Sequence, residues 1–389
     1  MGRRASKKEG GPDEIWIELV RQPGRFVCSR CGRRCRKYHD VSERWVRDLS
    51  ILDSPTWLLV PRFRAACPVC GPRVEYLPWL GKWSRVTKRL AESVGRLCEV
   101  LAIKHAATFY GLGWDTVKQI HKAYLAEKLG PVDLSGVEVI AMDEFAIQKG
   151  HRYATVIVEP RSKRVLWVGR GRGRQDIRPF FELLGEEGRA HLQVVAMDMN
   201  PAYEEEARAQ CPQVEIVYDL FHVVAKYGRE VIDRVRVDEA NRLRHDKKAR
   251  KVIKGSRWLL LRNRRSLTRR KDRVKLDELL SANRKLMTVY VLKDDLKHLW
   301  DYRRARVARR FWEQWYARAI RSRIEPLKRF ARNLKHRIDG VLTHCRWPLN
   351  TGLLEGINNK IKVIKRMAYG FRDDEYFFLR IRAAFPGIP

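Results

Sequence analysis

Two short stretches of the sequence end an apolar run with an aspartate at the same step. Residues 139–145 read VIAMDEF and residues 194–200 read VVAMDMN, so Asp143 and Asp198 occupy equivalent places. Such runs are typical of buried strands, and ligands of open α/β sheets gather at the carboxyl ends of strands. Two carboxylates brought together there could bind a divalent cation. An aspartate after a strand also commonly caps the next helix or turn, which is the alternative for each residue alone.

Two other acidic residues could join this chemistry. Asp219 follows a third apolar run in YDLFHVV, three residues before His222. Glu355 lies in NTGLLEGINNKIK, where apolar residues recur at helical spacing and leave Glu355, Lys362 and Arg366 on a neighbouring face. An acid on such a basic helix face is either a salt-bridge partner or a metal ligand.

The cysteines indicate a second kind of metal site. Two Cys-x-x-Cys pairs, each followed by glycine, are formed by Cys28, Cys31, Cys67 and Cys70. Four thiolates from two such turns suit one tetrahedral structural zinc ion, and reduced cysteines without a metal are the alternative. The loop between the pairs is long, and Cys35 and His39 are spare ligands for the same ion.

The segment after the cysteines contains a helix-turn-helix pattern. Ala107, Gly111 and Val117 fall where this motif places its small contact residue, its turn glycine and a core residue of the recognition helix. Many helical hairpins show similar spacing, so an ordinary hairpin is the alternative. The second helix is expected to begin near Trp114. The side chains expected to face DNA are Lys118, His121 and Lys122.

Composition indicates a polyanionic partner. The chain has 81 Lys and Arg residues against 46 Asp and Glu, a formal net charge of +35, which nucleic acid would neutralise. Between residues 242 and 275, sixteen of thirty-four residues are Lys or Arg and two are acidic, which favours phosphate contacts over a merely solvated face. The side chains taken as contacts are Arg262, Arg264 and Arg265. Four nearby tryptophans could be core or could stack on an unpaired base, namely Trp258, Trp300, Trp312 and Trp315.

The hydrophobic pattern also predicts the elements that position these residues. Strands are expected at residues 137–142, 153–159, 164–168, 192–197 and 214–218, and helices at residues 176–184 and 202–209. A mostly helical insertion separates Asp219 from Glu355. No apolar run of about 18 residues and no signal-peptide core is present, so we expect a cytoplasmic protein that does not enter a membrane.

The order of these motifs resembles that of the bacterial insertion-sequence transposases of the ISL-three family. The cysteine pairs, the helix-turn-helix pattern, AMDEFAIQKGHRYAT, AMDMNPAY, YDLFHVV, the basic stretch, NTGLLEGINNKIK and AYGFRD follow one another over nearly the whole chain. The resemblance implies a DDE transposase in which Asp143, Asp198 and Glu355 form the triad, supported by Asp219 and His222.

The resemblance also implies an α/β fold with several domains. The expected architecture is a ribonuclease-H-like mixed-sheet catalytic core with an all-α insertion, preceded by a zinc-binding module and a helix-turn-helix. The expected domains are a basic mobile tail (1–14), the zinc-binding module (15–82), the helix-turn-helix domain (83–132), the first part of the core (133–224), the basic helical insertion (225–345) and the C-terminal helices of the core (346–389).

The expected activity follows from the same resemblance. The protein would bind double-stranded DNA at terminal inverted repeats, cleave it with two Mg²⁺ or Mn²⁺ ions and join the freed 3′-hydroxyl to target DNA. We expect one structural Zn²⁺, further DNA contacts by Lys362 and Arg366, a homodimer or higher oligomer on DNA, and association with the bacterial nucleoid. The alternatives are a DNA-binding regulator that uses only the N-terminal modules and a structure-selective nuclease of the same fold.

Overall fold

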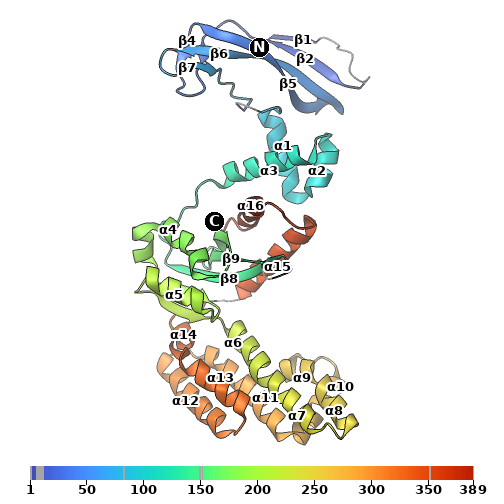
Figure 1. Ribbon diagram of the computed structural model, residues 1–389, viewed down its shortest axis with the longest axis vertical. Helices are drawn as coiled ribbons and strands as arrows, with labels where there is room; N and C mark the ends of the chain where they lie inside the picture. Colours follow the sequence, from blue (N-terminus) through green and yellow to red (C-terminus); the bar gives the residue numbers. More distant parts are fainter. Residues whose placement is uncertain are drawn as a thin grey trace. The chain divides into compact units, whose positions relative to one another are not determined.

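The computed structural model describes residues 2–5, 13–81, 84–148, 150, 152–349 and 352–388. The chain divides into two compact units. One comprises residues 1–131 and 365–380, and the other comprises residues 132–364 and 381–389. Figure 1 labels most of the helices and several of the strands of both units.

The first unit opens with a β-sheet built around a long hairpin. β5 (Tyr38–Ile51) and β6 (Ser54–Cys67) are joined by Leu52 and Asp53, whose φ values of 47° and 64° are those of a tight hairpin turn. The other strands are β1 (Gly2–Ala5), β2 (Ile15–Val20), β3 (Phe26–Val27), β4 (Arg34–Cys35) and β7 (Gly71–Val74). β2 pairs in parallel with β6, whereas β1 pairs antiparallel with β2. The strand β1 therefore lies where the sequence predicted a mobile tail; residues 6–12 of that tail lie outside the described residues.

Three helices follow the sheet. They are α1 (Lys88–Val100), α2 (Ile103–Tyr110) and α3 (Trp114–Leu129). α2 ends at Gly111, which has a φ of 61°, and the N–H of Leu112 returns to the carbonyl of Ala107. A left-handed residue of this kind closes a helix and costs least when it is glycine. Ala107 and Val117 are buried in the contact between the helices, as the helix-turn-helix pattern predicted, and Val94 and Ala106 join them there.

The second unit is organised around a mixed five-stranded sheet. The strands are β8 (Val139–Gln148), β9 (Arg152–Glu159), β10 (Arg164–Arg170), β11 (Val194–Met197) and β12 (Glu215–Tyr218). Their order is β10-β9-β8-β11-β12, with β8, β9 and β10 antiparallel and β11 parallel to both β8 and β12. β11 is buried along its whole length, as expected of a strand covered on both faces. The mixed α/β character predicted from the sequence is confirmed.

Helices alternate with the parallel strands of this sheet. They are α4 (Arg174–His191), α5 (Pro201–Gln210) and α6 (Leu220–Tyr227). α4 is longer than predicted and bends at Gly185, whose φ is 70°. The side chain of Asp219 caps α6 by accepting a hydrogen bond from the N–H of Phe221.

The helical insertion continues directly from α6. Its elements are the π-helical turn η1 (Gly228–Ile232), α7 (Asp233–Arg242), α8 (Lys247–Gly255), α9 (Arg257–Leu261), η2 (Arg264–Ser266), α10 (Arg270–Ala282), α11 (Arg284–Lys297), η3 (His298–Asp301), α12 (Ala305–Arg321), α13 (Glu325–Lys335), α14 (Ile338–Leu342) and η4 (Thr343–Cys345). The chain ends with α15 (Gly352–Met367) and α16 (Asp374–Ala384).

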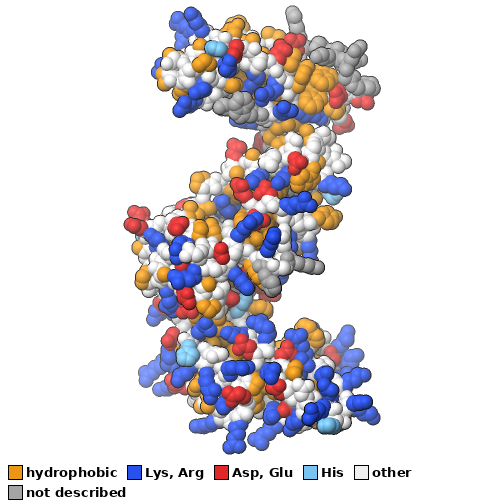
Figure 2. Space-filling view, in the orientation of Figure 1, with side chains coloured by type: hydrophobic (Ala, Val, Ile, Leu, Met, Phe, Trp, Pro, Cys, Tyr) orange, Lys and Arg blue, Asp and Glu red, His pale blue; other side chains and the backbone are white. Residues whose placement is uncertain are grey.

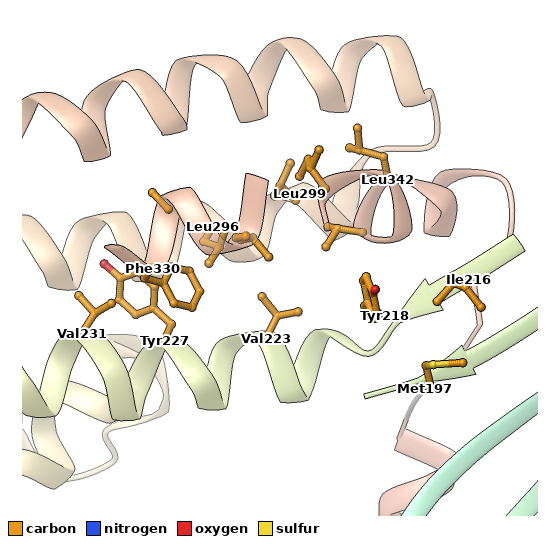
Figure 3. Packing of buried hydrophobic residues seen from close by; sticks show 14 of the residues in the cluster. Met197, Ile216, Tyr218, Val223, Tyr227, Val231, Leu296, Leu299, Phe330 and Leu342 are labelled. Carbon is orange, nitrogen blue, oxygen red and sulfur yellow. The ribbon is translucent and has the colours of Figure 1, made fainter. Parts of the chain in front are cut away.

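One hydrophobic cluster runs from the sheet into the insertion. Met197 and Ile216 from the sheet belong to it, as do Tyr227 of α6 and Phe330 of α13. Figure 3 shows the side chains of α6 packed between the strand ends and the insertion helices. The hydroxyl of Tyr227 donates to the carbonyl of Val289 at 2.8 Å, which satisfies the only polar group of this buried side chain. The insertion and the sheet therefore share one core.

Candidate functional site

Three aspartates lie in one row across neighbouring parallel strands. The ladders pair Ala141 of β8 with Ala196 of β11, and Met197 of β11 with Tyr218 of β12. Continuing these two registers places Asp143, Asp198 and Asp219 at equivalent steps of β8, β11 and β12. The near-repeat in the sequence thus corresponds to a shared position in the sheet.

Asp143 does not end its strand, which corrects the sequence prediction. β8 extends to Gln148, and Asp143 pairs with Val156 of the antiparallel strand β9. Pairing between β8 and β11 stops at Ala141. Because β9 keeps pairing beyond this point, β8 continues as a strand after it has left β11. Asp143 therefore lies at the fork between the two strands.

Asp143 and Asp219 are buried, Asp198 is partly buried, and the three carboxylates are close enough to affect one another. Burial raises the pKa of Asp143 to about 6, His222 opposes this rise, and the charges of Asp198 and Asp219 add to it. Burial also raises the pKa of Asp198, with Glu144 and Asp219 contributing. Buried carboxylates that repel one another favour their protonated forms unless a cation is present. The row therefore has the electrostatic character of a cation site.

Each aspartate is also oriented by hydrogen bonds. Asp143 accepts from the N–H of Glu144 at 2.8 Å, and Asp198 accepts from the N–H of Asn200 at 3.0 Å. The other carboxylate oxygen of Asp219 lies 3.8 Å from Nε2 of His222. The aspartates therefore accept hydrogen bonds from nearby backbone N–H groups, as a turn or helix cap does, and they also lie near one another.

Asn358 links α15 to the row, and sequence reasoning did not identify it. Its Nδ2 donates to Oδ2 of Asp143 at 2.6 Å, while its Oδ1 is buried without a hydrogen-bond partner. The signal in the sequence was the pair of asparagines that follows Glu355 by one helical turn in LLEGINNK. A polar residue three positions after Glu355 lies on nearly the same side of the helix.

Glu355 itself is exposed in the first turn of α15. Among the described residues, no hydrogen bond or ion pair joins Glu355 to Asp143 or Asp198, and these three carboxylates do not form a cluster tight enough to share an ion. The contact between Asn358 and Asp143 nevertheless brings this side of α15 to the row.

A basic loop lies against the same edge of the sheet. Arg172 donates to Glu144 at 2.9 Å, and its guanidinium lies 4.1 Å from the centre of the Tyr153 ring. Asn200 donates to the carbonyl of Arg172 at 3.4 Å. The sequence run GRGRGR (residues 169–174) is therefore held beside the carboxylates by contacts of one of its middle residues, Arg172.

The four predicted cysteines converge in the first unit. The Sγ atoms of Cys28, Cys31, Cys67 and Cys70 all lie within 4.8 Å of one another. The Sγ atoms of Cys31 and Cys67 are 3.7 Å apart, close to the ~3.8 Å edge of a tetrahedron with zinc–sulfur bonds of ~2.3 Å. N–H groups of Cys70 and Val69 lower the pKa of the Cys67 thiol to about 6, which favours the thiolate that a metal requires. The cluster could hold one zinc ion.

The two spare ligands are not part of this cluster. Cys35 is buried beside it, but its Sγ contacts the carbonyl of Arg33 at 3.7 Å. His39 is directed to Asp40, with Nδ1 3.1 Å from the carboxylate. Among the described residues, the four-cysteine set is the one group of histidine, cysteine and acidic side chains with metal-ligand spacing.

Comparison with known proteins identifies the family. A family model described as "Transposase" matches residues 140–381, and one described as "Helix-turn-helix domain of transposase family ISL3" matches residues 75–125. The transposase for insertion sequence element IS1001 of Bordetella parapertussis is 56% identical over 403 residues, covering 100% of this chain and 99% of that protein. This chain belongs to the ISL3 family of transposases. The transposase for insertion sequence element IS1557 of Mycobacterium tuberculosis is 27% identical over 374 residues, covering 90% of this chain and 83% of its own length. The resemblance seen in the sequence motifs is confirmed.

The recognition helix of the transposase differs from the prediction in which side chains it exposes. His121 is fully buried, and its Nδ1 lies 2.7 Å from the hydroxyl of Tyr376 in α16. Burial, with a smaller contribution from the positive charges of Arg380 and Lys128, lowers the pKa of His121 to about 3. The prediction that His121 contacts DNA is therefore wrong for this structure, because its ring lies inside the contact between α3 and α16.

Lys118 and Lys122, which were also predicted to contact DNA, form ion pairs within the protein. Nζ of Lys118 lies 3.0 Å from Asp373, and Lys122 lies 3.2 Å from Asp373 and 2.6 Å from Glu375. Their side chains are 17% and 21% exposed, which is low for lysine at a DNA-reading surface. The sequence pattern could not reveal these partners, because they follow the recognition helix by about 250 residues.

The basic stretch of the transposase lies on the insertion. Figure 2 shows lysine and arginine side chains spread over this helical part of the molecule. Arg262, Arg264 and Arg265 are all exposed, but Arg264 forms a two-point ion pair with Asp277, at 2.9 and 2.7 Å. Buried Lys293 fixes the start of this loop by donating to the carbonyls of Leu260 and Arg262 at 2.8 and 3.0 Å. These hydrogen bonds hold the backbone at the start of the loop that carries the three arginines.

Other predicted side chains take different environments. Trp312 and Trp315 are buried and Trp300 packs against the same core, whereas Trp258 is 68% exposed. Lys362 and Arg366 are exposed on α15, and Lys362 donates to Asn359 at 3.2 Å. In the part of the chain that the structure describes, no helix has the length and apolar character needed to cross a bilayer.

Proposed function

We propose that this transposase binds the terminal inverted repeats of its own element, hydrolyses the DNA there and transfers the freed 3′-hydroxyl to target DNA. The row of Asp143, Asp198 and Asp219 is the observation that carries this proposal, because phosphoryl transfer needs a fixed group of carboxylates beside the scissile phosphate. Membership of the ISL3 family supplies the reaction class.

The sheet supports a ribonuclease-H-like reading of the core. Three antiparallel strands, β10, β9 and β8, are followed outward by two parallel strands, β11 and β12. The acidic row lies at the carboxyl ends of β11 and β12 and at the fork of β8, where the ligands of such sheets gather. We propose that this is the catalytic core and that residues 225–345 are an insertion within it.

The chemistry of the row fits Mg²⁺ or Mn²⁺. These ions prefer carboxylate oxygens and keep several waters, so two or three acids are enough. Asp143 and Asp198 would hold the ions, and a cation would favour the charged forms that burial and, to a smaller degree, the neighbouring carboxylates disfavour by raising both pKa values. Two ions bound there would supply an activated oxygen on one side of the phosphorus and charge stabilisation on the other.

The remaining residues of the site would orient these ligands. Asn358 holds one oxygen of Asp143, and the N–H of Glu144 holds the other. Asp219 fixes the start of α6 and lies near His222, so the pair would support the edge of the row. We propose Glu355 as the third acid of the triad, because it lies one helical turn before Asn358 on α15.

Substitution of the triad tests the proposal. Asp143→Asn, Asp198→Asn and Glu355→Gln should each abolish cleavage and strand joining on DNA ends in Mg²⁺, while binding to the same DNA stays within a few fold. Glu186→Gln, which removes an exposed acid on α4, is the matched control and should keep activity. Near-normal cleavage by any triad variant would remove that residue from the proposed site. Cleavage without joining by the unmodified chain would favour a nuclease, and repeat binding without cleavage would favour a regulator.

A further inference from the structure

The recognition helix α3 has three distinct faces, and two of them are occupied. Val117 and Ile120 pack on the hydrophobic contact with α1 and α2. The approach of α1 is close: a side chain at Gly95 would meet the ring of Tyr124 at 2.3 Å. This face holds the three helices together and is closed to a ligand.

The second face is covered by the start of α16. Asp373 and Glu375 bind the two lysines of α3, and Tyr376 covers His121. Arg380 also ties α16 to α1 by donating to the carbonyl of Cys98 at 2.5 Å. The charges on this face are therefore paired within the protein.

The third face is open. Thr116, Gln119 and Ala123 are exposed, and a helix with 3.6 residues per turn places them within about 60° of one another. Thr116 and Gln119 lie in the first half of α3, the part of a recognition helix that contacts base edges, and Ala123 lies one turn further on. Asp115 lies at the edge of this face and is also exposed. We call Thr116, Gln119 and Ala123 the reading stripe.

We propose that the reading stripe, rather than the lysines of α3, reads the DNA sequence and that Gln119 recognises an adenine. The occupant is double-stranded DNA, because this segment matches the helix-turn-helix of the ISL3 transposases and the chain carries a net charge of +35. Lys104, exposed in the first turn of α2, lies where the first helix of the motif crosses a phosphate backbone. This inference rests on the proposed function, since it concerns the DNA that the transposase binds.

The side chains of the stripe determine the base pair. The amide of Gln119 can donate to N7 and accept from the N6 amino group of adenine, a two-point contact that other base pairs do not offer in the major groove. The methyl groups of Thr116 and Ala123 suit the methyl group of thymine. Guanine is read best by Arg or Lys, and the stripe has neither. The geometry therefore assigns an A·T pair to the stripe.

Selection from a randomised duplex pool tests this assignment with the full-length chain. The unmodified protein should enrich a motif that contains a fixed A·T pair. Gln119→Ala should lose the preference at that pair by roughly 5- to 100-fold and keep it elsewhere. Gln119→Glu should shift the preferred base from adenine to cytosine, because a carboxylate accepts from the cytosine amino group but cannot donate to N7 of adenine. Glu127→Ala, which changes an exposed residue in the last turns of α3, is the matched control and should leave the motif unchanged.

The lysine variants separate this proposal from its alternative. Lys118→Ala and Lys122→Ala should leave the base preferences unchanged. The inference is overturned if these variants alter the motif while Gln119→Ala keeps it at every position. An unmodified chain that enriches no motif would contradict repeat binding in the proposed function, and this inference with it. A motif retained in Gln119→Ala would contradict this inference alone.

Discussion

The buried histidine of the recognition helix should make the contact between α3 and α16 sensitive to acid. His121 faces Tyr376 and Arg380 from α16, and Tyr124 and Lys128 from its own helix. Its pKa is lowered from 6.5 to about 3, mainly by burial. His121 therefore stays neutral while α3 and α16 are in contact, whereas it would bind a proton below about pH 6.5 once the two helices separate. The stability of the contact is complete above about pH 6.5 and falls as the pH drops toward 3.

The size of this effect follows from the same values. At pH 5, an opened histidine with an ordinary pKa is largely protonated while His121 stays neutral, which costs the folded contact about 2 kcal/mol. The population with α3 and α16 separated should therefore be roughly 30-fold larger at pH 5 than at neutral pH. His121→Gln keeps a polar partner for the Tyr376 hydroxyl and removes the titration. The variant should lose this dependence on pH.

Hydrogen–deuterium exchange of peptides from α3 and α16 in the full-length chain would measure the opening locally. The unmodified protein and His121→Gln should exchange within a few fold of one another at pH 7.5. At pH 5 the unmodified protein should exchange roughly 30-fold faster than the variant in these two helices. His105→Gln, at an exposed position of α2, controls for the loss of one histidine and should behave like the unmodified protein. An equal ratio at both pH values would refute the reasoning, since the histidine would then not be held neutral by burial.

Two more predictions concern the other sites. The purified chain should contain one zinc per molecule, and Cys67→Ser should lose the zinc and unfold the sheet that carries β5 and β6. Cys35→Ser should keep the metal, and elemental analysis with circular dichroism checks both variants. Zinc loss from Cys35→Ser would assign a different ligand set. Arg265→Ala should weaken binding to repeat and random DNA alike and flatten its salt dependence by roughly 0.9 log units per lost phosphate contact. Arg264→Ala should change this slope less, because Arg264 is already paired with Asp277, and equal slopes for the two variants would contradict phosphate contact by Arg265.

Local patterns in the sequence predicted the features that depend on neighbouring residues. The repeated step of Asp143 and Asp198 follows from strand register, and Gly111 follows from the backbone conformation that ends α2. The four cysteines were identified by spacing because each Cys-x-x-Cys turn is local, although tertiary structure brings the two turns together across 36 residues. In each case the signal itself lies in a few adjacent residues.

Features that depend on distant segments were missed. His121 reads as a polar residue on a recognition helix, but Tyr376 covers it from 255 residues away. Asn358 reads as an ordinary helix residue until α15 is placed on Asp143, 215 residues earlier. The extension of β8 past Asp143 depends on pairing with β9, which no apolar run of β8 alone could indicate. Side-chain partners across such separations are set by tertiary packing and leave little trace in local periodicity.

The shared core of sheet and insertion limits how such enzymes can be recombined. α6 begins at the cap formed by Asp219 and runs without interruption into η1. Tyr227 at the end of α6 and Val231 in η1 are buried against insertion helices (Figure 3). The insertion thus packs on the edge of the sheet that bears the acidic row and cannot be exchanged as an independent domain. A chimera that grafts a relative's insertion at residues 225–345 would leave Ile216, Tyr218 and Val223 facing foreign partners. A viable graft would have to carry α6 and its partners at the ends of β11 and β12 along with it.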